Sequence, residues 1–142
     1  RTPRPEWERE LGARFVSLEV LLEASDFVSL HCPLLPETRH LIDAAALARM
    51  PAHACLVNTA RGAIVDERAL VRALENGEIA AAGLDVYEHE PELAPGLDRL
   101  ENAVLLPHLG SATQETRDAM ARICADAVIA VLGGGAPEHA LT

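Results

Sequence analysis

The sequence predicts an α/β fold, a doubly wound parallel sheet with helices on both faces. Short apolar segments alternate with longer amphipathic segments along the chain, which is the order expected of strand–helix–strand units. The apolar segments lack the polar–apolar alternation of a half-exposed strand, and unbroken apolar strands are typical of parallel sheets buried on both faces. Ligands of such sheets bind at the carboxyl ends of the strands. We therefore expect a functional site at that edge.

Four helices are predicted, and each begins at a side chain that can accept hydrogen bonds from the first helical turn. The segment 66–78 gives the clearest pattern, because Leu70, Val71 and Leu74 form an apolar stripe and Gly77 suits the position after the helix end. The helices and their caps are 17–25 with Ser17, 43–50 with Asp43, 66–78 with Asp66, and 113–134 with Thr113.

Four strands are predicted between these helices. Pro33 ends the first strand, because proline has no N–H to donate to a neighbouring strand. The third strand is made of small residues. The strands are 26–33, 54–59, 81–86 and 103–107, and from the first of them on the order is strand, helix, strand, helix, strand, strand, helix.

Composition excludes several classes of function. The chain has 142 residues, of which 49% are hydrophobic and 24% charged, so one soluble globular domain or most of one is expected. The net charge of -10 argues against non-specific binding to nucleic acid or to an anionic membrane. Cys32, Cys55 and Cys124 lie far apart without metal-ligand spacing, so we expect reduced thiols, no metal site and a cytoplasmic protein without a targeting or membrane-spanning segment.

Polar residues follow three successive predicted strands. Arg61 follows the second strand, Asp85 ends the third, and His108 follows the fourth. Arginine suits the binding of a carboxylate, and histidine suits proton transfer near neutral pH. Glu88 or Glu90 could supply a carboxylate that orients the imidazole. Each residue alone has a structural explanation, but together they are the minimum set for reducing a 2-keto acid with a hydride donor.

Three long stretches carry a resemblance to a known family. They are SDFVSLHCPLLPETRHLI at 25–42, NTARGAIVDERALVRALENGEIAAAGLDVYEHEP at 58–91 and NAVLLPHLGSAT at 102–113. The chain resembles the D-isomer-specific 2-hydroxyacid dehydrogenases, a family that includes phosphoglycerate dehydrogenase, glyoxylate/hydroxypyruvate reductase and D-lactate dehydrogenase. This resemblance implies a Rossmann-like nucleotide-binding domain and an oxidoreductase that transfers a hydride between a nicotinamide cofactor and a small 2-keto or 2-hydroxy acid.

The resemblance also implies the catalytic residues. The family's arginine in N-x-x-R-G corresponds to Arg61, which would hold the substrate's carboxylate and keto oxygen. The carboxylate that precedes proline in D-V-x-x-x-E-P corresponds to Glu90 rather than Glu88. The acid–base histidine in P-H-x-G corresponds to His108, paired with Glu90.

The cofactor is implied by further matches. Arg1, Thr2 and Arg4 form a small cationic group like the NADP-reading turn of glyoxylate/hydroxypyruvate reductases, so we favour NADP over NAD, although some NAD users also carry arginine here. Asp85 would accept a hydrogen bond from the nicotinamide carboxamide. The positions that match the family's cofactor-binding residues are Arg1, Thr2, Cys32, Pro33, Thr59, Ala60, Asp85, His108 and Gly110.

The chain departs from the family in one large respect, because the Gly-rich turn G-x-G-x-x-G that cradles the pyrophosphate is absent. We therefore expect residues 1–134 to be the C-terminal part of a dinucleotide-binding domain, with 135–142 leading towards a substrate domain. Alone, the chain would be inactive, and the full-length enzyme would be a homodimer. The alternative is a nucleotide-sensing interaction module, like the family's corepressor branch.

The resemblance also predicts a strand order. In the doubly wound order 3-2-1-4-5-6, a chain that begins after strand 2 would use 26–31 as strand 3 and 54–59 as strand 4. Two absent strands would then separate them by roughly 14 Å, at about 4.8 Å per neighbour. Unpaired backbone groups on both sides of such a gap would be costly, so the chain would fold poorly by itself.

Overall fold

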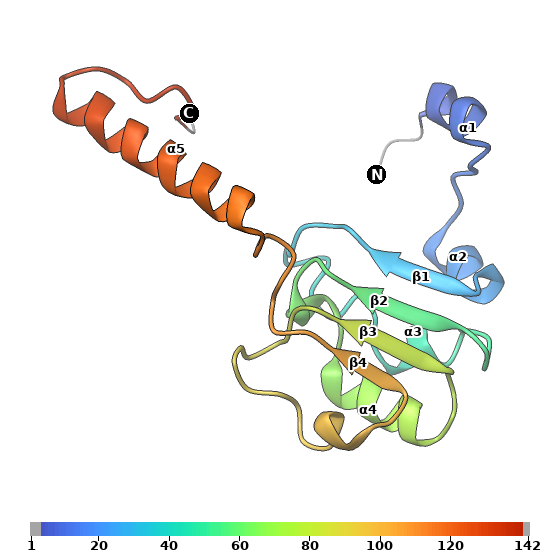
Figure 1. Cartoon of the computed structure of the whole chain (residues 1–142). Coiled ribbons are helices and arrows are strands. Elements are labelled where there is room, and N and C mark those ends of the chain that lie inside the picture. Colours follow the sequence, from blue (N-terminus) through green and yellow to red (C-terminus); the bar gives the residue numbers. More distant parts are fainter. Residues whose placement is uncertain (1–3, 141–142) are drawn as a thin grey trace. The chain divides into compact units, whose positions relative to one another are not determined.

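The computed structural model describes residues 4–140, and the chain divides into two units (Figure 1). The first unit ends at Pro107 and contains a parallel sheet with its helices. The second unit begins at His108 and contains one long helix. The expectation that residues 135–142 lead towards a substrate domain is a separate matter from this division at His108, and it stays a prediction.

The first unit is built on four parallel strands in the order β1-β2-β3-β4 (Figure 1). The pairing is in register, with Val28 opposite Leu56, Leu56 opposite Ala82, and Ala82 opposite Ala103. The predicted α/β class with a parallel sheet is confirmed. The strands are β1 (Phe27–Leu30), β2 (Cys55–Asn58), β3 (Ala81–Leu84) and β4 (Ala103–Leu105).

The four predicted helix caps are confirmed. The side chains of Ser17, Asp43, Asp66 and Thr113 each accept a hydrogen bond from the backbone N–H three residues later. The second predicted helix ends early, because the N–H groups after Ala48 donate to carbonyls three residues back and not four. The helices are α1 (Pro5–Leu11), α2 (Leu18–Ala24), α3 (Ala44–Leu47), α4 (Glu67–Glu75) and α5 (Gln114–Leu132), with short 3₁₀ turns at η1 (Gly62–Ile64) and η2 (Leu97–Arg99).

One helix, α1, was missing from the sequence prediction. Pro5 stands in its first turn and Gly12 follows it in the left-handed conformation with φ 62°, so both standard end signals are present. None of its side chains is buried. The usual apolar stripe that reveals a helix in a sequence is therefore absent from this one.

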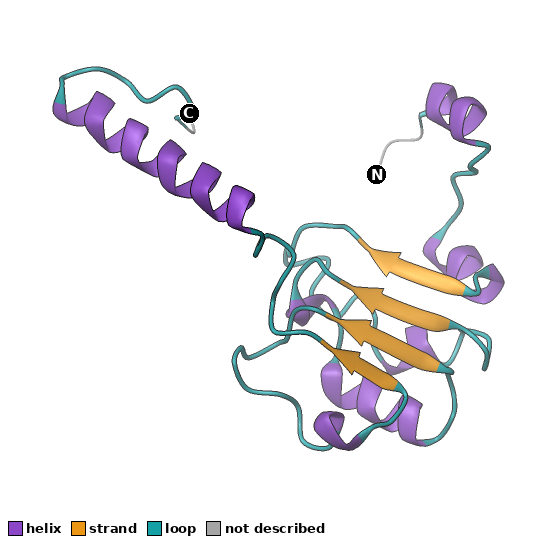
Figure 2. Cartoon of the chain, in the orientation of Figure 1, coloured by secondary structure: helices purple, strands orange, loops and turns teal. Residues whose placement is uncertain are grey.

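The core lies on one face of the sheet. Leu22 of α2, Leu47 of α3 and Leu70 of α4 pack in one cluster with strand residues such as Val28 and Leu56. Figure 2 shows α3 and α4 on the same side of the strands. On the opposite face of this unit, alternate strand residues are accessible.

Two apolar strand residues on this face are accessible within the first unit. Phe27 in β1 is 74% exposed and Val104 in β4 is 65% exposed, so the helices of the first unit cover mainly the other face. The expected helices on both faces stay a prediction. Phe27 and Val104 remain the clearest apolar surface of the sheet.

The predicted strand gap was wrong. Strands β1 and β2 are direct hydrogen-bonded neighbours, with Phe27 opposite Cys55 and Leu30 opposite Asn58. A single crossover through a helix places the second parallel strand beside the first, and each later crossover here adds one strand on the same side. The error was to assign 26–31 as the third of six strands. The expected poor folding of the chain was derived from the gap, so it has no basis once the gap is gone.

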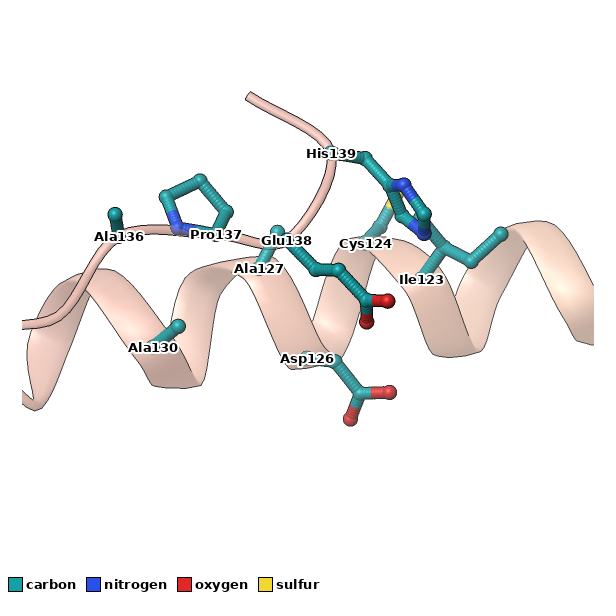
Figure 3. Close-up of a pocket in the computed structure, with 9 residues that line it drawn as sticks. All are labelled: Ile123, Cys124, Asp126, Ala127, Ala130, Ala136, Pro137, Glu138 and His139. Atoms are coloured by element: carbon teal, nitrogen blue, oxygen red, sulfur yellow. The ribbon is translucent and has the colours of Figure 1, made fainter.

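The second unit consists of residues 108–113, α5 and the chain that follows it. After Gly133, the chain turns at Gly134 with φ 78°, and the N–H of Gly135 donates to the Ala130 carbonyl at 2.9 Å. Residues 136–139 return along the helix above Cys124, which leaves a hollow of about 600 Å³ (Figure 3). No residue of this unit that the structure describes is buried. Throughout residues 4–140, no helix is both long and apolar enough to cross a membrane.

Candidate functional site

The candidate site lies at the edge where the four parallel strands end. Cys32 and Pro33 follow β1, Thr59 and Ala60 follow β2, and Asp85 follows β3 directly. Parallel strands bring these carboxyl ends to the same edge of the sheet, as Figure 1 shows. Asp85 is buried, whereas Pro33 and Thr59 are more accessible. The edge thus offers small accessible side chains around one buried carboxyl group.

The turn after β2 is fixed by a buried amide side chain. Asn58 is only 1% exposed, and its Oδ1 accepts from the N–H of Ala60 at 3.1 Å. Its Nδ2 donates to the Arg61 carbonyl at 3.0 Å. The backbone of Arg61 is therefore held from inside the protein, while its side chain is exposed, with Nη1 donating to the Ala60 carbonyl at 2.6 Å.

The loops after β2 and β3 contact each other through Gly62. A Cβ atom at Gly62 would lie 1.9 Å from the Tyr87 carbonyl carbon and 2.4 Å from the Glu88 nitrogen. Only glycine lets the two backbones approach so closely. The N–H of Asp85 also donates to the Asn58 carbonyl at 3.0 Å. The turn that carries Arg61 is thereby joined to the loop that contains Glu88 and Glu90.

A buried carboxylate supports the loop after β3. Glu67, the first residue of α4, is 3% exposed and accepts a hydrogen bond from the Glu88 N–H. Burial raises the pKa of Glu67, because the loss of water around the charged form outweighs the backbone N–H groups and the nearby His89 that favour it.

The two candidate glutamates have different surroundings. The Glu88 Oε1 lies 2.7 Å from His40 Nε2 and 3.1 Å from Arg39 Nη2, and its side chain is largely buried. Glu90 is exposed, and its Oε1 accepts from the Tyr87 N–H at 3.0 Å. Glu88 is thus engaged by side chains of another loop, whereas Glu90 lies on the exposed part of its own loop.

Tyr87 connects the same loop to the end of β4. Its hydroxyl group donates to the Leu106 carbonyl at 2.8 Å and lies 3.3 Å from the Leu84 carbonyl. Burial raises the pKa of Tyr87, because the phenolate would lose water in this position. The loop is therefore tied at its start to both neighbouring strand ends.

The predicted catalytic residues are divided between the two units. The loops of Arg61 and Glu90 come together in the first unit, through the Gly62 contact. His108 is the first residue of the second unit, where it is exposed with φ 56°, and Gly110 follows it there. The pairing of His108 with Glu90 stays a prediction. Arg1 and Thr2 lie outside the described residues.

Sequence reasoning missed the residues that hold the site in place. Asn58 is a polar residue at the last position of an apolar strand, and Glu67 follows a helix cap directly. Gly62 follows the candidate arginine. A polar side chain at the end of a buried segment was the available signal, because burial of such a group requires hydrogen-bond partners.

The residues at this edge fit part of a nicotinamide dinucleotide. The buried Asp85 carboxyl could accept a hydrogen bond from an amide, and the exposed Thr59 beside the half-buried Ala60 adds a hydroxyl group and a small side chain that a nucleotide could approach. The chain contains no G-x-G-x-x-G turn for the pyrophosphate. Among residues 4–140, no group of three or more His, Cys, Asp or Glu side chains could hold a metal ion.

A parallel sheet of this kind, with an accessible arginine and a buried carboxyl group at its carboxyl edge, is typical of dinucleotide-binding domains. Residues 1–110 match the model of one family, described as D-isomer specific 2-hydroxyacid dehydrogenase, NAD binding domain. The chain therefore belongs to the D-isomer specific 2-hydroxyacid dehydrogenases, as the sequence motifs predicted.

Similar proteins agree with this assignment. A glyoxylate reductase of Thermococcus litoralis is 51% identical over 139 residues, which cover 98% of this chain and 42% of that protein. The TT0316 protein from Thermus thermophilus has a TM-score of 0.86 and 49% identity, over 97% of this chain and 43% of that one. An NADPH-dependent glyoxylate/hydroxypyruvate reductase from Sinorhizobium meliloti, in complex with NADP and malonate, has a TM-score of 0.83 and 40% identity, over 92% and 40%. The chain thus spans about two fifths of the length of these relatives.

Proposed function

We propose that this chain is part of the nucleotide-binding domain of a nicotinamide-dependent 2-hydroxyacid dehydrogenase that reduces a small 2-keto acid such as glyoxylate or hydroxypyruvate. The observation that carries the proposal is the exposed guanidinium of Arg61 on a turn fixed by buried Asn58, joined through Gly62 to the loop of Glu90. A cation held at a strand end by interior contacts is suited to binding a carboxylate in one orientation.

In this function, Arg61 binds the substrate's carboxylate and keto oxygen. A bound reduced nicotinamide would supply the hydride for the keto carbon. His108 donates a proton to the keto oxygen, and in the reverse direction it takes the proton from the hydroxyl group. Glu90, paired with His108, keeps the imidazole oriented and stabilises its protonated form. Asp85 accepts a hydrogen bond from the carboxamide of the cofactor.

We further propose NADP as the preferred cofactor, read by the cationic group that Arg1, Thr2 and Arg4 form. Within the described residues, Arg4 stacks over the Trp7 ring, with the guanidinium carbon 4.3 Å from the ring centroid. A guanidinium held on an aromatic face keeps its N–H groups free at the rim for a phosphate. The full-length enzyme would be a cytoplasmic homodimer.

The test is a spectrophotometric assay of the full-length protein with glyoxylate, hydroxypyruvate or pyruvate and either NADH or NADPH. We expect oxidation of the reduced cofactor with at least one keto acid, and loss of most turnover in Arg61→Ala. Arg72→Ala is the matched control, because Arg72 is an exposed arginine on α4 away from the strand ends. Binding of dinucleotide without turnover of any keto acid would favour the interaction module instead.

A further inference from the structure

We propose that Glu67 is a positioning residue for the reaction, because its buried carboxylate anchors the loop that contains Glu90. The inference rests on the proposed function. Glu67 is outside the catalytic set, and it lies beneath the loop and not at the strand ends. Its hydrogen bond from the Glu88 N–H is the observation that carries the argument.

Glu67 holds the loop close to Glu90. The Glu88 N–H, which donates to the Glu67 carboxylate, lies two residues before Glu90. The backbone of Tyr87 and Glu88 also lies against Gly62. A backbone held by two such contacts leaves few conformations for the residue that follows it.

The position of Glu67 suits a carboxylate and no other common side chain. It is the first residue of α4, where the helix dipole favours a negative charge. Glutamine has the same shape, but it is neutral, and a hydrogen bond to a neutral oxygen is weaker than one to a carboxylate. The position therefore favours a charged acceptor, although burial of the charge is unfavourable in itself.

The constraint reaches Glu90 through the next residues. The Glu90 Oε1 accepts from the Tyr87 N–H at 3.0 Å, directly before the anchored N–H of Glu88. The same backbone contacts Gly62, which adjoins Arg61. Glu67 thus helps to fix the candidate carboxylate relative to the candidate substrate clamp, without contact to either reacting group.

The experiment compares Glu67→Gln with Glu75→Gln in the full-length protein, since Glu75 is an exposed glutamate on the same helix. Hydrogen exchange of the Glu88 amide reports the anchor directly, and steady-state kinetics reports its consequence. In Glu67→Gln we expect this amide to exchange at least about tenfold faster. We expect kcat to fall roughly 10- to 100-fold, because a small misplacement of a catalytic group is enough for such a loss. The KM for the dinucleotide should stay unchanged, and Glu75→Gln should resemble the wild type.

The outcomes separate this inference from the function on which it rests. Unchanged exchange at the Glu88 amide would overturn the anchor, whatever the enzyme does. Faster exchange with wild-type kcat would overturn the positioning role. Equal losses of kcat and of dinucleotide affinity would also overturn it, because they indicate general loosening of the domain. A wild-type protein that turns over no keto acid would instead contradict the proposed function, while the exchange measurement would still decide the anchor.

Discussion

The loops after β2 and β3 differ from the segment that begins at His108 in how their polar residues are held. In the two loops, buried polar side chains such as Asn58 and Glu67 bind the backbone from beneath. From His108 to residue 140, no side chain is buried. Strand ends that look alike in the sequence are therefore supported differently in the structure. A substitution in the loops after β2 and β3 should affect folding as well as function.

The largest effect expected from this comparison concerns His108, where activity and stability should separate. In full-length His108→Ala, we expect kcat to fall roughly 10²- to 10⁴-fold, the usual contribution of a positioned acid–base group. The urea midpoint should hardly change, because His108 is exposed. His139→Ala, another exposed histidine of the same unit, is the control for both measurements. Near-normal kcat in His108→Ala would remove it as the proton donor.

Gly62 is expected to show the opposite behaviour, with folding affected first. In Gly62→Ala, the new methyl group would overlap the Tyr87 backbone, so one of the two loops must move. Such overpacking costs about 3 kcal/mol or more when backbone must shift. Gly83→Ala is the matched control, since a Cβ there meets nothing within 4 Å. Urea unfolding of the two variants measures the difference, and equal stabilities would contradict the close approach.

A smaller loss is expected when the turn of Arg61 loses its internal support. Asn58→Ala removes two hydrogen bonds and leaves the Ala60 N–H without its side-chain acceptor, while the Arg61 carbonyl keeps only the longer bond from the Ile64 N–H at 3.3 Å. We expect the free energy of unfolding to fall by about 2 kcal/mol, at roughly 1 kcal/mol per bond. Asn76→Ala, at the exposed end of α4, should cost much less. A similar loss in both variants, measured by urea unfolding, would mean that Asn58 does not support the turn.

The same contrast explains what the sequence could and could not predict. Strand ends and helix caps were predictable, because Asp43, Asp66 and Thr113 act through hydrogen bonds to residues only three positions away. The roles of Gly62 and Glu67 depend on residues more than twenty positions distant, and no local pattern encodes such a contact.

The predicted strand order was wrong for a different reason, because it was derived from an assumed number of absent strands. The pairing of Phe27 with Cys55 depends on the crossover between those two strands and not on that count. The rule that consecutive parallel strands joined by one crossover usually lie side by side would have predicted the pairing of β1 with β2 correctly.

The smallest expected effect is a change in how stability depends on pH, and it tests whether Glu67 is kept at a cost to stability. Burial raises the pKa of Glu67 above its ordinary value of 4.5, so the folded protein binds this proton more tightly than the unfolded chain. The favourable contribution is complete below pH 4.5 and is lost as the pH rises through the higher pKa of the folded state. Glutamine cannot ionise, so the free energy of unfolding of Glu67→Gln should rise relative to the wild type over that interval. Urea unfolding at a series of pH values measures this, with Glu75→Gln expected to follow the wild type.

Parallel curves for the wild type and Glu67→Gln would show that burial does not disfavour the charged form. A rising difference would mean that the chain keeps an ionised group which its own folding disfavours, as expected if the carboxylate serves to hold the loop of Glu90.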